Sequence, residues 1–363
     1  MNKVLFIVPF DYEKIGGIRL PVLKYIESLK RHSIQVDLKT ISYHPKKKEM
    51  DNIFDTNDCR TVVVYGLNQA NSVIGYCKRK KTILAFDKLI GLLIDSETLY
   101  ATSILSSLNP FLSPKRYFMF YLKSKLYRKR EKECLLNFTD VLYVSKVDAN
   151  YVNENFKLIT ASIHVVENGI VAPKHFRSRN HNYAFFRIGF ISTLSKSVVQ
   201  ENLKPLVEIV MPAVLKKFPN AKLVVAGKGG NQHLADYLSR FPYIDYLGPV
   251  SSLDLFYEDV DVVVPITLKR NGILNKILEA WSYGKCVIAY SYNFFAFDSA
   301  LKNKHYLCGE NLFEISTIIE DVISQKYDID SIGLEARKLV INNFSWAEKQ
   351  DLFLKIVGSN EDN

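Results

Sequence analysis

A short segment in the second half of the chain combines an apolar run, a glycine turn and the start of a charged helix. The run 262–264 ends at Pro265, Gly272 interrupts the following loop, and residues 273–283 have a helical pattern. A helix N-terminus presents free backbone amides and a partial positive charge, which suit a phosphate group. Glycine lets a ligand approach the backbone closely. The segment therefore predicts an anion-binding loop.

Two charged side chains follow on this helix. Lys276 adds a cation one turn in, and Glu279 stands six residues past Ile273, roughly 9 Å along the helix axis. A carboxylate there can accept hydrogen bonds from sugar hydroxyls while a diphosphate stays at the helix start. Like charge keeps it off the phosphates, so we expect Glu279 to hold a ribose. The alternative is that Glu279 and Lys276 are solvated neighbours on a surface helix.

Other reactive side chains are sparse. Asp87 follows the apolar run 82–86, which predicts a strand end facing a ligand, where the carboxylate could orient an acceptor hydroxyl. The alternative is a helix N-cap before Lys88. None of the seven histidines stands in a recognisable nucleophile arrangement. The five cysteines lie far apart, with no CxxC pair, so we expect neither a disulfide framework nor a zinc site.

These residues need a scaffold, and the apolar pattern predicts one. Continuous Val/Ile/Leu runs alternate with helical segments, which is typical of parallel strands covered on both faces. We expect strands at 4–8, 34–38, 61–65, 82–86, 141–144, 187–191, 223–226, 243–247, 260–264 and 286–290, with helices from Leu20, over 203–217 and over 273–283.

The chain divides into two similar halves. Residues 172–185 are polar and irregular, as in a linker, and the alternation restarts at Arg187. We therefore expect an α/β protein of two doubly wound, Rossmann-like domains facing a cleft, over 1–172 and 183–344. The glycine-rich turn 227–230, which follows the expected strand 223–226, agrees with a doubly wound second domain.

The positive charge is concentrated in the first half. The chain has 48 Lys+Arg and 38 Asp+Glu, a net charge of +10, and residues 1–172 carry +9 of it. An anionic partner should therefore face that half. Average hydropathy and charge exclude a disordered chain, and no apolar run is long enough to span a membrane. The short apolar run after Met1 fits a first strand better than a signal peptide.

One basic stretch, residues 111–132, carries much of this excess. It holds eight Lys/Arg against a single acid, Glu131, interleaved with aromatic residues. A basic helix with an aromatic face fits adsorption to an anionic membrane or acceptor surface. We expect that surface to include Lys115, Arg116, Lys123, Arg128, Lys129 and Arg130. The alternative is a core-packing helix with a solvated outer face. No nucleic-acid motif accompanies the charge.

Several blocks, in order, resemble the GT-B glycosyltransferases of the retaining family-4 type (glycosyl transferases group 1). They are Gly16-Gly17 after the first strand; D-V-L-Y-V-S from Asp140; V-E-N-G-I from Val166; F-P-N-A-K-L-V-V-A-G-K-G from Phe218; L-G-P-V from Leu247; N-K-I-L-E-A from Asn275; G-K-C-V-I-A from Gly284; and F-S-W from Phe344. Each block is weak alone, and the full order with matching spacing is specific.

The resemblance implies which residues would bind a nucleoside diphosphate sugar. The backbone near Gly272, Ile273 and Leu274, together with Asn275 and Lys276, would meet the sugar and diphosphate. Glu279 would hold the ribose, and Val250 would contact the base through its backbone. Gly16 and Gly17 would cap the diphosphate from the first domain. The final helix, about 345–363, would cross back to that domain.

The resemblance also implies the reaction. A sugar would pass, with retention, from a UDP- or GDP-type donor to a glycan or lipid-linked acceptor, in bacterial surface polysaccharide synthesis, without a metal or further cofactor. The missing DxD motif favours metal independence. The protein would be cytoplasmic and peripheral on the inner face of the cell membrane.

Two departures leave alternatives open. Thr193 stands where the family has an arginine on the diphosphate, and Glu201 stands where it has a lysine. Lys196 could substitute for them. Asn271 replaces the first acid of the family's E-x7-E pattern. The chain could therefore be a catalytically weak GT-B partner subunit. A sugar-nucleotide 2-epimerase, another GT-B enzyme, would need cleft carboxylates and histidines that we cannot place.

Overall fold

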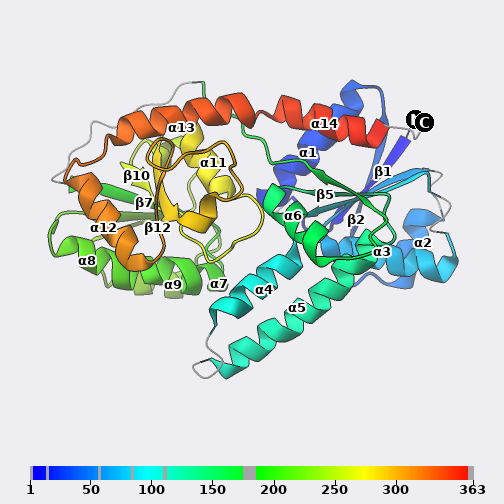
Figure 1. The fold of residues 1–363 in the computed structure, drawn as a ribbon, viewed down its shortest axis with the longest axis horizontal. Helices are drawn as coiled ribbons and strands as arrows, with labels where there is room; N and C mark the ends of the chain where they lie inside the picture. The colour runs from blue at the N-terminus through cyan, green and yellow to red at the C-terminus, as the bar shows by residue number, and fades with distance from the viewer. Residues whose placement is uncertain are drawn as a thin grey trace. The chain divides into compact units, whose positions relative to one another are not determined.

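The computed structural model describes residues 3–13, 16–55, 59–82, 86–108, 113–174 and 185–358, and it divides into two compact units (Figure 1). Unit 1 comprises Met1–Gly169, Lys269–Ile273 and Trp346–Asn363. Unit 2 comprises Ile170–Leu268 and Leu274–Ser345. The predicted boundaries at 172 and 183 remain predictions.

Unit 1 is built on a six-stranded parallel sheet in the order β2-β1-β3-β4-β5-β6. The strands are β1 (Lys3–Pro9), β2 (Gln35–Ile41), β3 (Thr61–Tyr65), β4 (Lys88–Ile94), β5 (Asp140–Tyr143) and β6 (Ser162–Val165). The helices are α1 (Gly16–Arg31), α2 (Lys47–Phe54), α3 (Leu67–Lys80), α4 (Glu97–Ser107), α5 (Pro114–Leu135), α6 (Lys146–Asn155) and α14 (Trp346–Gly358).

Both faces of this sheet are covered, which explains its continuous apolar strands. Successive side chains of a strand point to opposite faces. In β1, Val4, Phe6 and Val8 pack in one buried cluster with α1 and α14, whereas Leu5 and Ile7 pack in another with α2 and α3. No polar face is exposed along β1, so the strand cannot show hydrophobic alternation.

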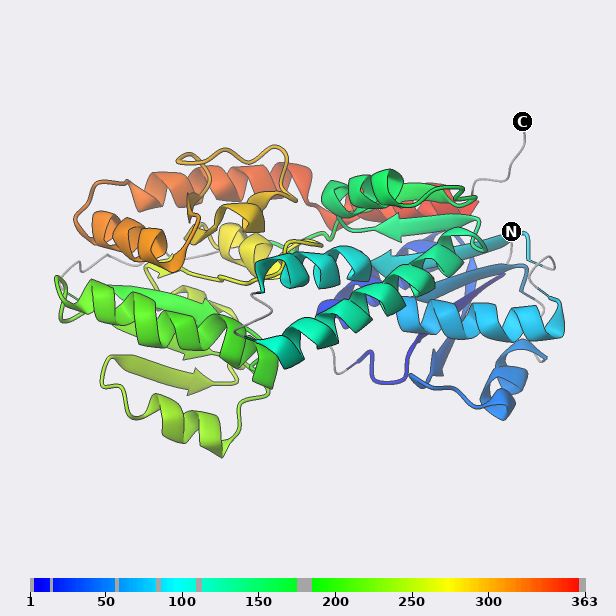
Figure 2. The same ribbon diagram turned by 60° about the horizontal axis from the view of Figure 1, so that its bottom comes forward.

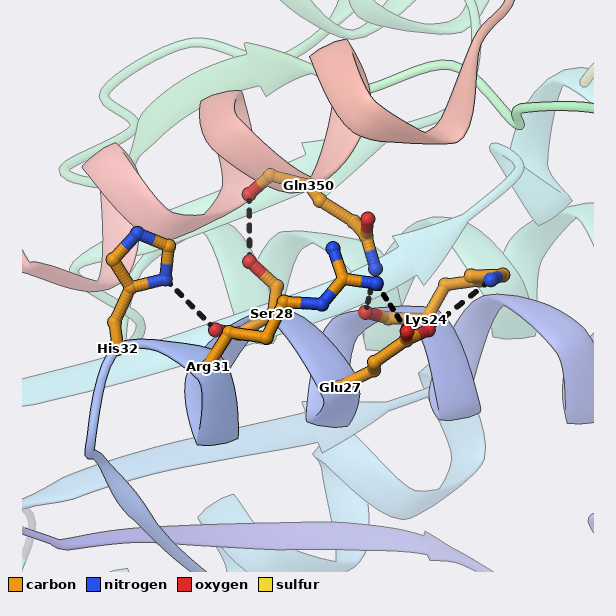
Figure 3. Close-up of polar contacts among 6 residues, drawn as sticks. All are labelled: Lys24, Glu27, Ser28, Arg31, His32 and Gln350. Carbon is orange, nitrogen blue, oxygen red and sulfur yellow. Dashed lines mark hydrogen bonds and ion pairs between the residues drawn. The ribbon is translucent and has the colours of Figure 1, made fainter.

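The last helix, α14, is part of unit 1 and lies beside α1 (Figure 1). Its Phe353 is fully buried, and its ring centre lies 4.2 Å from that of Tyr25 on α1, with the two rings tilted by 34°. Figure 3 shows the polar side of the same contact: the Ser28 hydroxyl donates to the backbone carbonyl of Gln350 at 3.3 Å, and the Gln350 amide donates to the carbonyl of Lys24. Apolar burial and buried hydrogen bonds thus join the last helix to the first.

Unit 2 repeats the architecture with a six-stranded sheet in the order β12-β11-β10-β7-β8-β9. Its strands are β7 (Arg187–Ile191), β8 (Lys222–Ala226), β9 (Ile244–Gly248), β10 (Val262–Val263), β11 (Cys286–Tyr290) and β12 (Leu307–Gly309). Its helical elements are α7 (Lys196–Val198), η3 (Val199–Leu203), η4 (Leu206–Val210), α8 (Met211–Leu215), α9 (Gln232–Leu238), α10 (Asp254–Tyr257), α11 (Asn275–Ser282), η5 (Ser291–Phe294), α12 (Leu312–Ile323) and α13 (Ile329–Asn343).

The predicted fold class of two doubly wound parallel sheets is confirmed, while several element bounds differ. The strand expected at 82–86 is wrong: Thr82 and Phe86 are not in a strand, residues 83–85 lie outside the described residues, and the strand is Lys88–Ile94. The helix expected from Leu203 starts earlier, at Lys196, and ends at Leu215. Most of the expected linker, 175–184, lies outside the described residues.

Candidate active site

The strand order of unit 2 marks where a ligand should bind. From β7 the chain runs to β8 and β9 on one side, then returns to β10 on the other side of β7. Such a topological switch point opens a crevice beyond the carboxyl ends of the two strands, where doubly wound sheets bind ligands. The loops after β7 and after β10 flank it, and α11 begins at the end of the second loop.

The predicted charged pair sits on α11. Leu274 occupies the N-cap position with extended backbone angles and provides no side-chain cap, so the helix start lacks the usual side-chain acceptor. Asn275 is the first helical residue. One turn on, the Lys276 Nζ lies 2.6 Å from Oε2 of Glu279. The lysine is therefore not an independent cation: it and Glu279 form a neutral pair.

Glu279 also contacts an aromatic pair. Its Oε2 accepts a hydrogen bond of 3.4 Å from the hydroxyl of Tyr257, which is fully buried. The Tyr257 ring stacks on that of Tyr283 at 4.5 Å. The pKa of the Tyr257 hydroxyl lies well above its ordinary value because of burial and the Glu279 charge, so this hydroxyl stays a donor. Lys276 and Tyr257 therefore both contact Oε2 of this carboxylate.

Val250 and Lys196 also lie beyond the carboxyl edge of the unit 2 sheet. Val250 is half-buried, two residues past the end of β9. Lys196 opens α7, five residues beyond the last residue of β7 at Ile191, and is exposed. Thr193 precedes it, exposed, in the same loop.

Unit 1 has its own switch point, between β1 and β3, because β2 lies on the other side of β1. The loop after β1 ends where Gly16 and Gly17 open α1. The predicted glycines thus stand at the carboxyl end of β1, where a ligand could approach the backbone.

The expectation that Asp87 ends a strand is wrong, and so is the alternative helix cap. Asp87 precedes β4 at the amino end of that strand, is exposed, and pairs with Arg60 at 2.9 Å. Because ligands bind at carboxyl ends, nothing here supports a catalytic role for Asp87. The residue that does follow β4 is Asp95. The apolar run LIGLLI, which precedes Asp95, could have indicated in the sequence that a strand ends there.

Asp95 belongs to a partly buried polar cluster in unit 1 that includes the segment Lys269–Ile273. The Lys269 ammonium lies 3.3 Å from Asp95 Oδ2, and the Asn271 amide donates to the Ser96 carbonyl at 3.3 Å. The backbone N–H of Gly272 donates to Asp148 Oδ2 at 2.7 Å. Ile273 is buried. The glycine loop predicted to meet a phosphate is thus held by carboxylates of unit 1.

Asp148 is the centre of that cluster. It is fully buried and accepts hydrogen bonds from the Ser145 hydroxyl and from the Ser96 N–H at 2.7 Å. Burial, and then the charge of Asp95, raise the pKa of its carboxyl to about 7. Asp95 also raises the pKa of Lys269. The S-x-x-D spacing of Ser145 and Asp148 is a capping signature that could have marked this residue.

The single acid of the basic stretch faces inward. Glu131, on α5, is fully buried and accepts from the Ser96 hydroxyl at 3.1 Å and the Tyr143 hydroxyl at 2.7 Å. Burial raises the pKa of its carboxyl. Figure 2 shows α5 beside α4 along the edge of unit 1. With Glu131 inside, the side chains that α5 exposes over 114–132 include no acid.

The exposed face of α5 is both apolar and basic. Its exposed apolar residues are Phe118, Met119, Tyr121, Leu122 and Leu126, and Phe118 is 60% exposed. Its exposed or half-buried basic residues include Lys115, Arg116, Lys123, Arg128, Lys129 and Arg130. Arg128 and Arg130 donate to neutral oxygens of Asn155 and Asn68. The stretch therefore keeps its positive charge.

Two searches of the described ranges gave negative results. No group of three or more His, Cys, Asp and Glu side chains there could hold a metal ion. Within the same ranges, no helix is both long enough and apolar enough to cross a membrane.

Comparisons with known proteins agree with this architecture. Residues 186–311 match the family described as glycosyl transferases group 1. No curated protein sequence matches the chain. The structure of HepE from Anabaena in complex with UDP-glucose is similar with a TM-score of 0.67 and 14% identity, over 99% of this chain and 100% of that one.

Two further solved structures are similar. WaaG, a glycosyltransferase involved in lipopolysaccharide biosynthesis, has a TM-score of 0.65 and 11% identity, over 98% of this chain and 100% of that one. TarM has a TM-score of 0.60 and 17% identity over 84% of this chain, which spans only 56% of TarM. At these identities the likeness concerns the fold.

Proposed function

We propose that the chain is a glycosyltransferase that moves a sugar, with retention, from a nucleoside diphosphate sugar to a glycan or lipid-linked acceptor. Its fold is GT-B, and residues 186–311 match the glycosyl transferases group 1 family. The observation that carries this proposal is Glu279, fixed on α11 beside the β7–β10 switch point. A UDP-type donor is favoured because HepE binds UDP-glucose.

The proposed mode of donor binding is based on α11. The helix start after Leu274, which has no side-chain cap, offers backbone amides to a diphosphate. Glu279 then accepts hydrogen bonds from the ribose hydroxyls, while Tyr257 and Lys276 hold the carboxylate in place. Val250 contacts the base through its backbone, and the part expected of Gly16 and Gly17 at the diphosphate stays a prediction.

Catalysis in this proposal depends on the leaving group. The diphosphate departs and the acceptor attacks from the same face, so stabilising the departing phosphate charge lowers the barrier without a protein nucleophile. The amides of α11 and the Lys196 ammonium supply that stabilisation. No metal or further cofactor enters the step.

The test is UDP affinity in Glu279→Gln, measured by calorimetry. Losing hydrogen bonds to a charged acceptor costs about 1.5–3 kcal/mol, so affinity should fall roughly ten- to 150-fold. Glu258→Gln, an exposed acid of the same unit, is the matched control and should bind UDP like the wild type. Unchanged affinity in Glu279→Gln would remove the ribose assignment.

A second candidate, a catalytically weak partner subunit, is favoured by Thr193 and Glu201, which are not cations at the expected diphosphate positions. The two proposals differ in one measurement. An active transferase hydrolyses or transfers its preferred UDP-sugar, whereas a partner subunit shows no turnover with UDP-, GDP- or dTDP-sugars while remaining folded.

We further propose that α5 binds an anionic membrane surface, with the protein on the cytoplasmic side of a bacterial membrane. The support is its exposed Phe118 and Leu122 flanked by lysines and arginines. Such a surface would bring the enzyme to a lipid-linked acceptor. The structurally similar WaaG, a glycosyltransferase involved in lipopolysaccharide biosynthesis, favours a surface-polysaccharide setting.

A further inference from the structure

A buried carboxylate of unit 1 holds the turn that precedes α11. Asp148 lies on α6, and its two oxygens accept hydrogen bonds from different segments. Oδ1 accepts from the Ser96 N–H at 2.7 Å, and Oδ2 accepts from the Gly272 N–H at 2.7 Å. The Ser145 hydroxyl also donates to Oδ2. This side chain therefore joins α6, the residue that follows β4 by two positions, and the turn at Gly272.

The ionised form of Asp148 is the one that suits both N–H groups. An ionised carboxylate has two acceptor oxygens and no proton. Protonation places an O–H on one of these oxygens, which then faces a backbone N–H donor, and it removes the charge that strengthens the hydrogen bonds. The contacts of Asp148 with Ser96 and Gly272 cannot both keep their strength in the protonated acid.

The charge of Asp148 and its contact with Gly272 are therefore linked. Burial, and then the charge of Asp95, raise the pKa of the Asp148 carboxyl to about 7. The hydrogen bonds from Ser145, Ser96 and Gly272 act on this pKa in the opposite direction. Because the Gly272 N–H favours the ionised form, ionisation must favour the contact with Gly272 by the same free energy. A proton taken up near pH 7 loosens the turn.

The charged and titratable groups around Asp148 come from several segments of unit 1. They are Asp95 after β4, Glu97 on α4, Glu131 on α5, Tyr143 on β5 and Lys269 in the turn segment. Lys269 pairs with Asp95 at 3.3 Å, whereas Asp148 bonds to Gly272 itself. The charge state of Asp148 therefore acts on the turn directly.

The turn leads into the start of α11 through the chain itself. Ile273 alone separates Gly272 from Leu274, the N-cap residue of α11. In the proposed donor site, the backbone amides at this helix start meet the diphosphate. Asn271 adds a second tie beside Gly272, since its side-chain amide donates to the Ser96 carbonyl at 3.3 Å. A displaced turn would carry the first amides of α11 with it.

We propose that Asp148 is a positioning residue for the donor: its carboxylate holds the turn at Gly272 and thereby the start of α11. Uptake of a proton by Asp148 weakens donor binding. This inference rests on the proposed donor site, and the state of the turn can also be measured without any nucleotide.

The first experiment measures UDP-glucose binding to the full-length protein by calorimetry at pH 6, 7 and 8. Both phosphates of this probe are esterified, so neither titrates in this range. A carboxyl with a pKa of about 7 is roughly nine-tenths ionised at pH 8 and about one-tenth ionised at pH 6. Wild-type affinity should therefore fall by up to about tenfold, or about 1.4 kcal/mol, between pH 8 and pH 6.

Two variants assign this pH dependence. Asp148→Asn puts an NH₂ group opposite one of the two N–H groups, so it should weaken binding about tenfold at pH 8 and abolish the dependence on pH. Asp351→Asn, the same change at an exposed acid of unit 1, should follow the wild type. Wild-type affinity in Asp148→Asn at pH 8, or an unchanged pH profile, would overturn the proposal.

The second experiment follows amide hydrogen exchange, by mass spectrometry, in a peptide that contains Gly272. After correction for the intrinsic rate, the wild type should lose protection between pH 8 and pH 6, and Asp148→Asn should be unprotected at both. Equal protection in the two proteins would overturn the hold of Asp148 on the turn. Failure of the wild type to bind UDP-glucose at any pH would count against the donor site instead, and the exchange result would stand independently.

A third variant keeps the proposal testable if Asp148→Asn fails to fold. Ser145→Ala retains the carboxylate and removes a hydrogen bond that lowers its pKa. The midpoint of the pH profile for UDP-glucose binding should then move to higher pH. An unchanged midpoint in Ser145→Ala would contradict the assignment of the profile to Asp148.

Discussion

Asp148 is a buried carboxylate whose protonation is coupled to its surroundings. Two backbone N–H groups and the Ser145 hydroxyl donate to it, which favours its ionised form, while burial and the neighbouring Asp95 carboxylate oppose ionisation more strongly. Lys269, paired with Asp95, is the nearest cation in the cluster, and Glu131 and Tyr143 lie beyond Ser96. The net result is a pKa above the ordinary value.

We predict that this group lowers stability as pH rises. Its pKa is about 7 in the folded protein and about 4 when unfolded, so between these values the folded state holds the proton more tightly. The stabilisation that the Asp148 carboxyl contributes is fully present below about pH 4. It is lost as the pH rises through about 7, by up to about 1.4 kcal/mol per pH unit. Urea unfolding at pH 5 and pH 8 should show a smaller loss in Asp148→Asn than in the wild type.

The control for that measurement is Asp351→Asn, which changes an exposed acid of unit 1. It should show the wild-type pH dependence. Equal pH dependence in Asp148→Asn and the wild type would mean that Asp148 is ionised throughout the range.

Gly272 is required by both backbone angle and space. Its φ is +68°, and a Cβ placed there would lie 2.2 Å from Asp95 Oδ1. We predict that Gly272→Ala lowers the melting temperature and displaces the loop, since a positive φ costs about 1–3 kcal/mol before any clash. Gly248→Ala isolates the first effect, because Gly248 has φ of +64° and open space at its Cβ position. Equal losses of melting temperature in the two variants would mean that the close approach of Asp95 to Gly272 does not affect stability.

At this scale the sequence identified local pairs and missed distant ones. The spacing of Lys276 and Glu279 predicted that they lie on one helix, and the structure adds that they pair with each other. Asp95, Asp148 and Gly272 meet across long stretches of chain, and no local pattern could bring them together. The prediction for Asp87 was wrong because β4 begins at Lys88, one residue after Asp87, whereas a strand was expected to end just before Asp87.

Helix α5 shows how an element can carry two opposite faces. Phe120, Ser124, Glu131 and Cys134 are buried on one face, while Phe118, Leu122 and Leu126 are exposed on another at four-residue spacing. Aromatic residues occur on both faces, so the aromatic content of the sequence alone could not separate a core face from a docking face.

We predict that Phe118→Ser with Leu122→Ser weakens binding to vesicles containing anionic lipid, by an amount that reflects two lost apolar side chains, about 1.5–3 kcal/mol each. Binding of the wild type should fall with added salt. Vesicle sedimentation measures both. The control pair, Leu334→Ser with Ile341→Ser, changes similarly exposed apolar residues on α13. Equal binding to neutral vesicles, or equal loss in both double variants, would contradict a docking role for α5.

Elements were predictable where the chain is buried on both faces. The ranges 61–65, 187–191 and 286–290 agree with β3, β7 and β11. Shorter or half-buried elements were not predicted, as with β6, whose four residues are partly exposed, and β12, which has three. Their short runs carry too little apolar signal to stand out from loops.

At the scale of the whole molecule, helix α14 supplies part of the buried core of unit 1. Phe353 is fully buried between Phe6 on β1 and Tyr25 on α1. We predict that Phe353→Ala destabilises unit 1 by about 3–5 kcal/mol, as for other buried phenylalanines. Leu352→Ala, next in sequence but exposed, should cost about 0.5 kcal/mol or less. Urea unfolding distinguishes them, and similar losses in the two variants would mean that α14 is not part of the core of unit 1.

The charge asymmetry also belongs to this scale. Residues 1–172 carry a net charge of +9, and in the structure much of it lies on α5, whose single acid over residues 114–132 is buried. The sequence located the charge correctly. It could not show that Glu131 points inward, which leaves the exposed face of α5 more basic than a count of residues suggests.

The place of α14 in unit 1 has a consequence for biosynthesis. About 180 residues separate Gly169 from Trp346, so the ribosome makes almost all of unit 2 before it makes the helix that covers one face of the first sheet. At roughly 5–20 residues per second, that delay is about 9–35 s. During this interval Phe6 and Tyr25 lack their partner Phe353, and the nascent first unit presents an uncovered apolar face that a chaperone could bind.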